Sequence, residues 1–520
     1  MASLISETLP RFTAKTLKLA AKQSQRCHVV PDRLRTAIEN YLREQEFLNM
    51  RQKVLSLSRS FTGIKEANLL LPSSTSKELV QDPLKAMERS QRWKLSTAYG
   101  DAGLRYQEDQ AIAYVASRMP AVYSALYRVL SEVRRRVPDF APTKVLDFGA
   151  GTGSALWAMM EVWPGSLEHI NLVEPSQSMQ RAGLGLIKDL KELPQIQSYD
   201  SLQSLTKNIS KNKSGRKHDL VIASYVLGEI PSLKDRITLV RQLWDLTEDI
   251  LVLVEPGTPQ GSKIITQMRS HILWMDNRRT RKLQNAAKKA SKDIMTLKTG
   301  AFIVAPCPHD GPCPLQDTEK YCHFVQRLER TPSQLLYKRS KGPLRGFEDE
   351  KFCYVAFRRG TRPREAWPLD GMKFETLNEM QANKIPENLE IDVESQFDSE
   401  EAESDEYEKD ADDRASNDQK LSHATTVNES GAEGVEEEAA AAASADLGSG
   451  WGRIIYMPFR RGKRVEMDIC RATNSEGTEG SFDRVVITQS KNPKLHHQAR
   501  RSIWGDLWPL RSEKNSKYFM

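Results

Sequence analysis

Four of the six cysteines have a spacing that would suit a metal site. The stretch CPHDGPCPLQDTEKYC at 307–322 holds Cys307, Cys313 and Cys322 in a C-x5-C-x8-C pattern, and Cys470 lies far beyond it. Four thiols in a reducing compartment are more often metal ligands than disulfide partners. These residues therefore indicate a four-cysteine metal centre, with unligated buried cysteines as the plain alternative.

The spacing leaves the kind of metal open. Structural zinc sites usually contain tight C-x2-C pairs, which this stretch lacks, whereas irregular spacing is compatible with an iron–sulfur cluster. His309 and His323 lie close to the same cysteines and could complete a mixed zinc site instead. The other two cysteines are not expected to bind metal. Cys27 borders a basic N-terminal segment, and Cys353 lies in an apolar strand, where a thiol packs as a small hydrophobe.

A second candidate site is the glycine turn in VLDFGAGTGSALWA at 145–158. Gly149, Gly151 and Gly153 would let the backbone turn tightly between a strand and a helix, and would let a ligand approach the main chain. The dinucleotide fingerprint G-x-G-x-x-G would need its third glycine where this chain has Ser154. The pattern instead fits the acid-x-G-x-G-x-G form that is typical of S-adenosylmethionine (SAM) sites.

Two acids would complete this SAM site. Asp147 stands two residues before the first glycine and suits the ammonium group at the amino-acid end of the ligand. Glu174 ends the second strand, where a carboxylate can accept both hydroxyls of an adenosine ribose. A glycine turn after one strand, with a second strand that ends in an acid, is a stronger signal than the turn alone.

The sequence assigns no catalytic residue. SYVLGEI at 224–230 stands where amino-group methyltransferases carry an Asn/Asp-Pro-Pro-aromatic motif, and it lacks that motif. Transfer to carbon 5 of cytosine needs a nucleophilic thiolate, but Cys307 is better explained as a metal ligand. Glu229 is likewise better explained as a structural acid than as a general base, so the catalytic residues stay unknown.

The elements around these sites predict an α/β fold. Residues 31–140 have helical spacing, with Val122, Leu126, Val129, Leu130 and Val133 on one face and Pro138 at the end. Apolar strands then alternate with helical segments, which indicates a parallel sheet covered on both faces. These strands are expected at 144–150, 169–175, 218–230 and 249–258, with a late antiparallel strand at 351–359.

The pattern of elements and composition predicts four regions after the N-terminal helices. A SAM-type Rossmann-like core is expected at 141–300, and a Cys-rich loop with the last core strand at 301–372. Residues 373–447 are acidic and rich in Ser and Ala, so they predict a disordered insert. Alternating apolar and polar residues at 448–520 predict a small C-terminal β-unit that supplies Cys470.

Charge points to an anionic partner. The net charge is +7, but residues 387–446 hold 21 acidic and 3 basic residues, so the other 460 residues carry +25. RNA is the obvious partner for such a body, although a merely soluble basic protein is the alternative. The densest basic segments are 277–292 and 460–464, and the first could equally be a solvated helix face.

The N-terminal composition and the lack of long apolar runs indicate where in the cell the protein is located. Residues 1–30 are basic and rich in Ser, Thr and Ala, which predicts an organellar transit peptide, with an ordinary basic first helix as the alternative. No apolar run approaches the roughly 18–20 residues that a membrane helix needs. The sequence therefore predicts a soluble protein with no membrane partner.

Taken together, these stretches resemble the methyltransferase-like family of mitochondrial small-ribosomal-subunit proteins and assembly factors, which has bacterial relatives. The resemblance spans most of residues 85–510 except the acidic insert, and its cysteine phrase is the most specific part. The matching phrases include AYVASRMPAVYSALYRVL, VLDFGAGTGSALWA, LVEPSQSM, SYVLGEI, LVEPGTPQG, CPHDGPCPL, YCHFVQRLERT, EDEKFCYVAFRR and SIWGDLWPL.

The resemblance implies a Rossmann-like SAM-dependent methyltransferase fold with an N-terminal helical region. It also implies a [4Fe–4S] cluster held by Cys307, Cys313, Cys322 and Cys470. Small-subunit rRNA and ribosomal proteins would be the partners, with the chain a monomer until it docks. The location would be the mitochondrial matrix, with the plastid as the alternative.

Two functions remain after this reading. The first is a ribosomal-subunit protein or assembly factor that binds rRNA and is required for mitochondrial translation. The second is an active SAM-dependent rRNA methyltransferase. The missing catalytic motif and the basic body favour the first.

Overall fold

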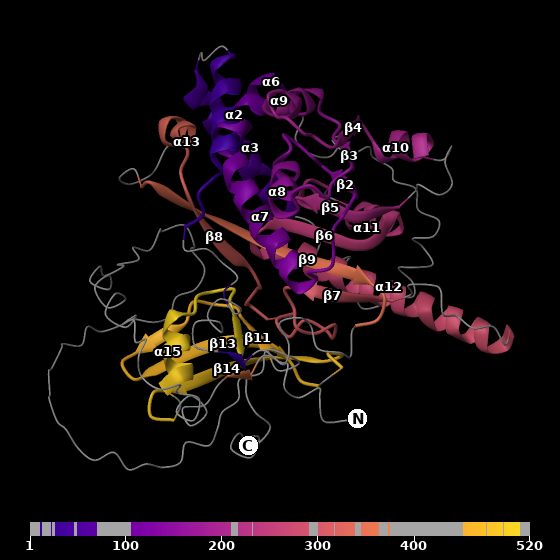
Figure 1. Ribbon diagram of the computed structural model, residues 1–520, viewed down its shortest axis with the longest axis vertical. Coiled ribbons are helices and arrows are strands. Elements are labelled where there is room, and N and C mark those ends of the chain that lie inside the picture. Colours follow the sequence, from indigo (N-terminus) through magenta and orange to yellow (C-terminus); the bar gives the residue numbers. More distant parts are fainter. Residues whose placement is uncertain are drawn as a thin grey trace, which may run out of the picture. The chain divides into compact units, whose positions relative to one another are not determined.

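The central element is a mixed sheet of eight strands (Figure 1). Its strands in the computed structural model are β2 (Lys144–Phe148), β3 (His169–Val173), β4 (Gln195–Tyr199), β5 (His218–Ser224), β6 (Thr247–Pro256), β7 (Ala301–Ala305), β8 (Phe324–Glu329) and β9 (Phe347–Arg359). The order is β4-β3-β2-β5-β6-β9-β7, and β8 also pairs with β9. The first five strands in this order are parallel, and β9 is antiparallel to β6, β7 and β8. This is the strand order of Rossmann-like methyltransferases, so the predicted fold class is confirmed.

The structure describes most of the chain outside the acidic insert. The described residues are 11–12, 22, 27–45, 49–69, 106–209, 217–230, 232–290, 300–316, 318–338, 345–362, 373–374, 451–474, 476–491 and 493–509.

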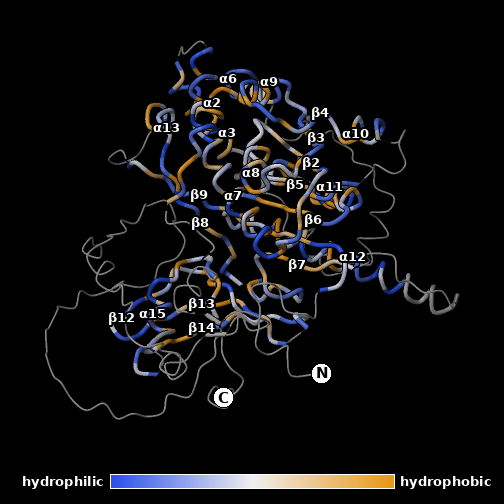
Figure 2. Tube along the Cα trace, in the orientation of Figure 1, coloured by the Kyte–Doolittle hydropathy of each residue, from blue (hydrophilic) through white to orange (hydrophobic). Residues whose placement is uncertain are grey.

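Helices cover both faces of the sheet. They are α2 (Asp32–Arg43), α3 (Met50–Leu69), α6 (Glu108–Ser117), α7 (Met119–Arg136), α8 (Ser154–Val162), α9 (Gln177–Ile187), α10 (Leu202–Ile209), α11 (Leu233–Leu246), α12 (Pro259–Ala290) and α13 (Pro332–Tyr337). Successive side chains of a strand point to opposite faces. In β6, Val252 therefore packs in the core on the α7 and α8 side, and Leu253 packs in the core on the α11 and α12 side. Figure 2 shows the apolar strands enclosed in this way.

The predicted apolar stripe of the N-terminal helical region is the buried face of α7. Val122, Leu126, Val129, Leu130 and Val133 are all buried. The helix ends at Arg136, just before Pro138, because proline disfavours helical geometry in the residue before it.

Strand β9 has two different neighbours along one edge. Residues 356–359 pair with β7, and residues 347–352 pair with β8. The chain that joins β7 to β8 therefore leaves this edge near the middle of β9, beside Cys353. This connection, residues 306–323, holds three of the cysteines and is called the cysteine loop below.

The strands of the main sheet agree with the sequence expectations in part and differ in part. The predicted strand at 351–359 is part of β9 and is antiparallel, as expected. The apolar stretch at 218–230 is a strand only as far as Ser224, and residues 227–229 form a 3-10 turn. Strands β4, β7 and β8 were not predicted. The sequence QIQSY of β4 is largely polar and lies at the exposed sheet edge, where burial imposes no apolar pattern.

The C-terminal residues form a second, smaller sheet. Its strands are β11 (Trp451–Ile454), β12 (Phe459–Arg461), β13 (Arg464–Ala472), β14 (Gly480–Thr488) and β15 (Leu507–Pro509), and α15 (Pro493–Arg501) packs against it. All pairings within this sheet are antiparallel. Two-residue strands β1 (Arg11–Phe12) and β10 (Lys373–Phe374) pair with each other. Residues 1–374 and 444–520 belong to one compact unit.

Two predictions concern segments outside these elements. The predicted acidic insert at 373–447 begins with the two residues of β10, and its other residues, 375–447, lie outside the described ones. Among the helices that the structure describes, none has both the length and the apolar character that crossing a membrane requires.

The residues just before α2 pack into the main body. His28 and Val30 are buried. His28 bridges to β8: its backbone N–H donates to the Arg327 carbonyl at 2.8 Å, and its carbonyl accepts from Glu329 N–H at 2.9 Å. Its ring forms a 2.9 Å hydrogen bond with the Ser124 hydroxyl and stacks on Tyr127 at 4.8 Å.

We expect His28→Ala to destabilise the protein by about 1–3 kcal/mol, through the lost hydrogen bond and ring stacking. Burial lowers the pKa of His28 to about 4. The unfolded chain therefore binds a proton that the folded chain rejects, and wild-type stability falls as the pH drops from about 6.5 toward 4. His28→Ala should lack this part of the pH dependence. Urea unfolding at pH 7 and pH 5 is the measurement. Val29→Ala, at a 52 % exposed neighbour, is the control, and equal effects of both variants would contradict the prediction.

Candidate functional site

The glycine turn joins β2 to α8 in a backbone conformation that favours glycine. Gly149, Gly151 and Gly153 have φ values of 73°, 55° and 84°, in the left-handed region that other residues rarely adopt. Gly149 N–H donates to the Val173 carbonyl at 2.8 Å, which ties the turn to the end of β3. The expectation of a tight strand-to-helix turn at these residues agrees with this geometry.

The two predicted acids lie beside the turn in different settings. Both carboxylate oxygens of Asp147 are buried and have no hydrogen-bond partner among the described residues. The Glu174 carboxylate accepts from Gly151 N–H and from Ser176 N–H, each at 2.9 Å. Burial raises the pKa of each acid to about 7, and the Glu174 charge adds to the shift of Asp147. The pair would therefore gain from a cation or a hydrogen-bond donor nearby.

A cavity of about 420 Å³ lies next to the glycine turn. This glycine-turn cavity is lined by Gly149, Gly151 and Glu174, and helix α3 contributes Leu57 and Phe61 to its wall. Asp147 does not line it. The volume falls in the range of about 300–1,000 Å³ that small-molecule sites occupy. Of the two predicted acids, the structure thus brings Glu174 to the cavity and leaves Asp147 behind the turn.

Two further acids line the same cavity. Glu229 accepts a hydrogen bond from the Tyr106 hydroxyl at 2.9 Å. Glu255, at the end of β6, accepts from Leu227 N–H at 2.8 Å and from Gly228 N–H at 3.1 Å, and burial raises its pKa to about 7. Glu255 holds the 3-10 turn that follows β5. The sequence signal for it was the acid at the end of a strand in LVEPG, the same pattern that revealed Glu174.

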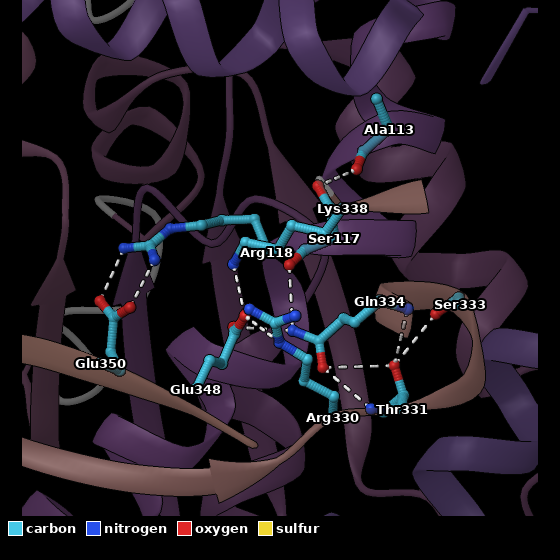
Figure 3. Close-up of polar contacts among 10 residues, drawn as sticks. All are labelled: Ala113, Ser117, Arg118, Arg330, Thr331, Ser333, Gln334, Lys338, Glu348 and Glu350. Atoms are coloured by element: carbon cyan, nitrogen blue, oxygen red, sulfur yellow. Dashed lines mark hydrogen bonds and ion pairs between the residues drawn. The ribbon is translucent and has the colours of Figure 1, made fainter. Parts of the chain in front are cut away.

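Arg118 and Tyr225 also line the cavity and belong to a polar network that the sequence did not predict. Arg118, at the end of α6, forms a bidentate ion pair with Glu350 of β9 at 2.5 and 2.7 Å (Figure 3). The Tyr225 hydroxyl donates to the same carboxylate at 2.9 Å. Tyr225 has a φ of 58°, which is unusual for a bulky residue and shows that its position is imposed by its surroundings. These three residues come from distant segments, so no local pattern connects them.

A second layer of contacts supports this wall. Lys338, which also lines the cavity, pairs with Glu348 of β9 at 2.7 Å. Gln334 donates to the same Glu348 at 2.9 Å and to the Ser117 carbonyl at 3.1 Å. Figure 3 shows α13, β9 and the end of α6 joined through these side chains. The network fixes this wall of the cavity.

The four predicted metal ligands line one small cavity. Cys307, Cys313 and Cys322 of the cysteine loop and Cys470 of β13 all border a space of about 40 Å³, called the cysteine cavity below. All four are free thiols. Burial raises the pKa values of Cys313, Cys322 and Cys470, and each rises further because the other thiols are close. Cys470 is far from the other three cysteines in the sequence, and the tertiary structure brings it to the cysteine loop.

The thiols do not stand at the spacing of ligands around one ion. Among the residues that the structure describes, no three His, Cys, Asp or Glu side chains form a group that could hold a metal ion. Of the two histidines considered as ligands, His309 lies 3.5 Å from the Cys470 sulfur through its Nε2. His323 stacks on Tyr321 instead, and it does not line the cysteine cavity.

Cys353 is closer to this cavity than its apolar strand suggested. It is buried, as expected, but it also lines the cysteine cavity. Its thiol donates to the Cys322 carbonyl at 3.2 Å. This contact follows from the place where the cysteine loop leaves β9. Cys27 is exposed and does not line the cavity, so it is the better control for substitutions there.

The first turns of α12 separate the two cavities. Gly261 and Ile264 line the glycine-turn cavity, whereas Ser262 and Ile265 line the cysteine cavity. A Cβ atom on Gly261 would stand 1.9 Å from the Pro256 carbonyl oxygen, so only glycine lets the helix begin this close to β6. The two candidate sites therefore share one rigid wall.

Both candidate sites lie in regions that match a known protein family. The family model described as mitochondrial small ribosomal subunit Rsm22 matches residues 108–369 and 402–509, which include the glycine turn and all four cysteines of the cysteine cavity. The chain belongs to the Rsm22 family. The recognition of a methyltransferase-like family of mitochondrial small-subunit proteins is confirmed.

Two of the following three relatives carry names from ribosome assembly. The human ribosome assembly protein METTL17, mitochondrial, is 33 % identical over 276 residues, which cover 52 % of this chain and 54 % of the relative. The Rsm22-cox11 tandem protein 2, mitochondrial, of Schizosaccharomyces pombe is 25 % identical over 85 % of this chain and 48 % of its own. The Saccharomyces cerevisiae ribosome assembly protein RSM22, mitochondrial, is 21 % identical over 76 % of this chain and 66 % of its own. The chain spans about half the length of the first two relatives.

Solved structures of methyltransferases also align. The plantazolicin methyltransferase BpumL in complex with SAH has a TM-score of 0.26 at 12 % identity, covering 54 % of this chain and 99 % of that one. The magnesium protoporphyrin IX methyltransferase of Synechocystis PCC 6803 with bound SAH has the same TM-score at 13 % identity, covering 55 % of this chain and 99 % of that one. The fold assignment rests on the strand order described above.

Proposed function

We propose that this protein is an assembly factor of the mitochondrial small ribosomal subunit that holds rRNA with a methyltransferase-like scaffold and a metal centre. The observation that carries the proposal is the convergence of four cysteines, from two distant parts of a chain of this family, on one cavity between the main sheet and the C-terminal sheet. The relatives named for mitochondrial ribosome assembly support the process. The matrix is the corresponding location.

The metal centre is proposed as a [4Fe–4S] cluster, with zinc as the alternative. Cys307, Cys313, Cys322 and Cys470 would hold it. The donor set fits, because cysteine thiolates are the usual ligands of such clusters. The surroundings fit as well: Arg269 is buried beside these thiols, and its Nε has no partner among the described residues. The cluster would join the two sheets as a cross-link, and no redox step is needed for this role.

Ligand binding in the glycine-turn cavity is a separate proposal. SAM or its demethylated product would lie against Gly149 and Gly151 with its ribose hydroxyls on Glu174. Each oxygen of this carboxylate accepts one backbone N–H and keeps a lone pair for a further donor. Asp147 would act from behind the turn through its charge, because it does not line the cavity.

We expect Glu174→Gln to weaken SAM binding by about 1–3 kcal/mol, because an amide nitrogen replaces one of the two acceptor oxygens for the ribose hydroxyls. Calorimetry on protein with an intact metal centre measures the change. Glu168→Gln, at an exposed acid in the loop before β3, is the matched control and should bind as wild type does. If wild-type protein shows neither heat nor thermal shift at millimolar SAM, the glycine turn is only architecture.

RNA binding is proposed for the two basic segments. Helix α12 continues beyond the sheet that it covers (Figure 1), and the coloured part just beyond the sheet is mostly hydrophilic (Figure 2). Arg281 and Lys282 are exposed there, and the side chains beyond Lys282 lie outside the described ones. In the second segment, Arg461 lies 4.5 Å from the ring of Phe459, which is 41 % exposed. Basic side chains beside an exposed aromatic ring suit phosphate contacts and base stacking.

We expect combined Gln substitution of Arg281, Lys282, Arg461 and Lys463 to weaken rRNA binding and to flatten its salt dependence. Each lost phosphate contact should reduce the slope of log K against log salt by about 0.7–0.9. Binding titrations at several salt concentrations measure this slope. Charge-conserving exchanges at the same positions, Arg→Lys and Lys→Arg, should preserve it. An unchanged slope in the Gln variant would place the RNA contacts elsewhere.

The alternative function, rRNA methylation, is supported by the glycine-turn cavity and its acids. Mass-spectrometric mapping of small-subunit rRNA from cells that lack the protein separates the two functions. A specific mark that wild type restores, and that an RNA-binding Glu174→Gln variant does not restore, would establish the methyltransferase. Complete rRNA modification with defective subunit assembly supports the assembly factor.

The transit peptide remains a prediction, and the packing of residues 27–30 bears on its end. Because His28 and Val30 are buried in the main body, we expect cleavage before Cys27 rather than after residue 30. N-terminal sequencing of the mature protein tests this boundary.

A further inference from the structure

One buried charge beside the cysteine cavity has no counter-charge in the described part of the chain. Arg269 of α12 lines the cavity and is 3 % exposed. Its guanidinium donates to the carbonyls of His309 at 3.0 Å and Gly311 at 2.6 Å, both in the cysteine loop. Among the residues that the structure describes, no carboxylate pairs with it, and its Nε has no hydrogen-bond partner.

The other arginines around the cavity differ in this respect. Arg453 also lines the cavity, but it forms an ion pair with Glu132. Arg362 contacts the cysteine loop, but Asp310 pairs with it at 2.7 Å. A buried ion costs several kcal/mol unless a counter-charge is near. Of these three arginines, Arg269 alone has no carboxylate partner among the described residues, and it stands where four cysteines meet.

We propose that Arg269 is the counter-charge of the metal centre. This inference rests on the proposed metal centre and adds a residue that binds no metal. A metal group ligated by four cysteine thiolates is anionic overall, because the thiolate charges outweigh the charge of the metal core. The guanidinium neutralises part of that charge, while its two carbonyl contacts hold the loop between Cys307 and Cys313 in place.

The two roles of Arg269 predict different effects for two variants. Arg269→Lys keeps the charge and loses the planar fork of donors. Arg269→Gln keeps amide donors for the two carbonyls and loses the charge. If charge is decisive, Arg269→Gln should shift the cluster's reduction potential to more negative values, because the reduced cluster carries one more negative charge. Arg269→Lys should stay close to wild type.

The effect of Arg269→Gln on thermal stability should change sign when the metal is removed. In the metal-free protein, Arg269→Gln removes an uncompensated buried cation, so its midpoint of thermal unfolding should lie above that of metal-free wild type. In the metal-loaded protein, the variant should lie below wild type. A merely structural clamp would destabilise both forms. This comparison applies equally to an iron–sulfur cluster and to zinc.

The experiment uses full-length protein purified anaerobically, with potential titration, metal and sulfide analysis, and thermal unfolding before and after chelation. A more negative potential in Arg269→Gln alone, with the reversal in stability, supports the proposal. The proposal is wrong if wild type, Arg269→Lys and Arg269→Gln all bind metal with the same reduction potential. It is also wrong if Arg269→Gln is less stable than wild type both with and without metal. Either result leaves the metal centre intact. Wild type that binds no metal would overturn the metal centre itself.

Discussion

Serine in place of Cys307, Cys313, Cys322 or Cys470 is expected to abolish most metal binding. Anaerobically purified wild type should be brown and should carry about four irons and four acid-labile sulfides per chain. Each variant loses one ligand of a single centre, so all four should lose iron and sulfide together. The measurements are iron and sulfide content and visible absorbance, together with subunit assembly in cells.

The loss of metal should also destabilise the protein. The cross-link between Cys322 and Cys470 closes a loop on the order of a hundred residues, for which chain entropy corresponds to about 4–5 kcal/mol. Hydrogen exchange should rise across residues 451–509 in every ligand variant. Assembly with the small subunit should weaken in parallel.

The two cysteines outside the predicted ligand set provide controls for these variants. Cys27→Ser should leave iron content unchanged, because Cys27 is exposed and does not line the cavity. Cys353→Ala should lower it slightly, since it removes the thiol that donates to the Cys322 carbonyl. A colourless wild type with one zinc would replace the cluster by zinc and preserve the cross-link. Unchanged metal in Cys470→Ser would remove the C-terminal sheet from the site.

Glu132→Gln should destabilise the joint between the two sheets by about 3–5 kcal/mol, because it leaves Arg453 buried without its counter-charge. Glu132 and Arg453 are each about 1 % exposed and form a bidentate pair. Arg453 also donates to the Pro306 carbonyl at 3.1 Å and to the Gly505 carbonyl at 2.8 Å. One guanidinium therefore joins α7, the cysteine loop and the C-terminal sheet.

Urea unfolding of the metal-free protein separates this pair from the metal centre. Glu132→Gln combined with Arg453→Met should recover much of the loss, since no buried charge is left unpaired. Arg484→Met is the matched control: its ion pair with Asp468 lies in the same sheet, but the arginine side chain is 59 % exposed, so the effect should stay below about 1 kcal/mol. A loss in Glu132→Gln no larger than in this control would show that the pair does not hold the joint.

The same pair predicts a pH dependence. Burial alone would raise the pKa of Glu132, but Arg453 holds it below its usual value. The pair therefore contributes stability that is present at neutral pH and is lost as the pH falls through the lowered pKa. Glu132→Gln should be less sensitive to acid in this range.

These contacts modify one expectation about the C-terminal sheet. A sheet that is joined to the core by so long a connection is expected to dock weakly without a metal cross-link. The Glu132–Arg453 pair shows that docking also uses direct contacts within the protein. The hydroxyl of Tyr354 in β9 adds a 2.6 Å hydrogen bond to the same Glu132. We therefore expect the metal-free protein to keep its C-terminal sheet docked but more open to exchange.

The sequence by itself determined the features that depend on neighbouring residues. Strand-to-helix turns, acids at strand ends and helical stripes are encoded within about ten residues, so Gly149, Gly151, Gly153 and Glu174 could be assigned locally. The cysteine loop was visible for the same reason. The alternation of strands and helices then indicated the fold class, because parallel strands need crossover helices.

Only the tertiary structure decided which distant side chains meet. Arg118, Tyr225 and Glu350 come together because α6, β5 and β9 converge, and nothing in their local sequence announces this contact. The place of Asp147 behind the turn and that of Cys353 beside the cysteine loop depend equally on packing. The unpaired charge of Arg269 is likewise a property of burial. Periodicity records which face of an element is apolar, whereas the partner of a buried polar group is set by elements that approach from elsewhere in the chain.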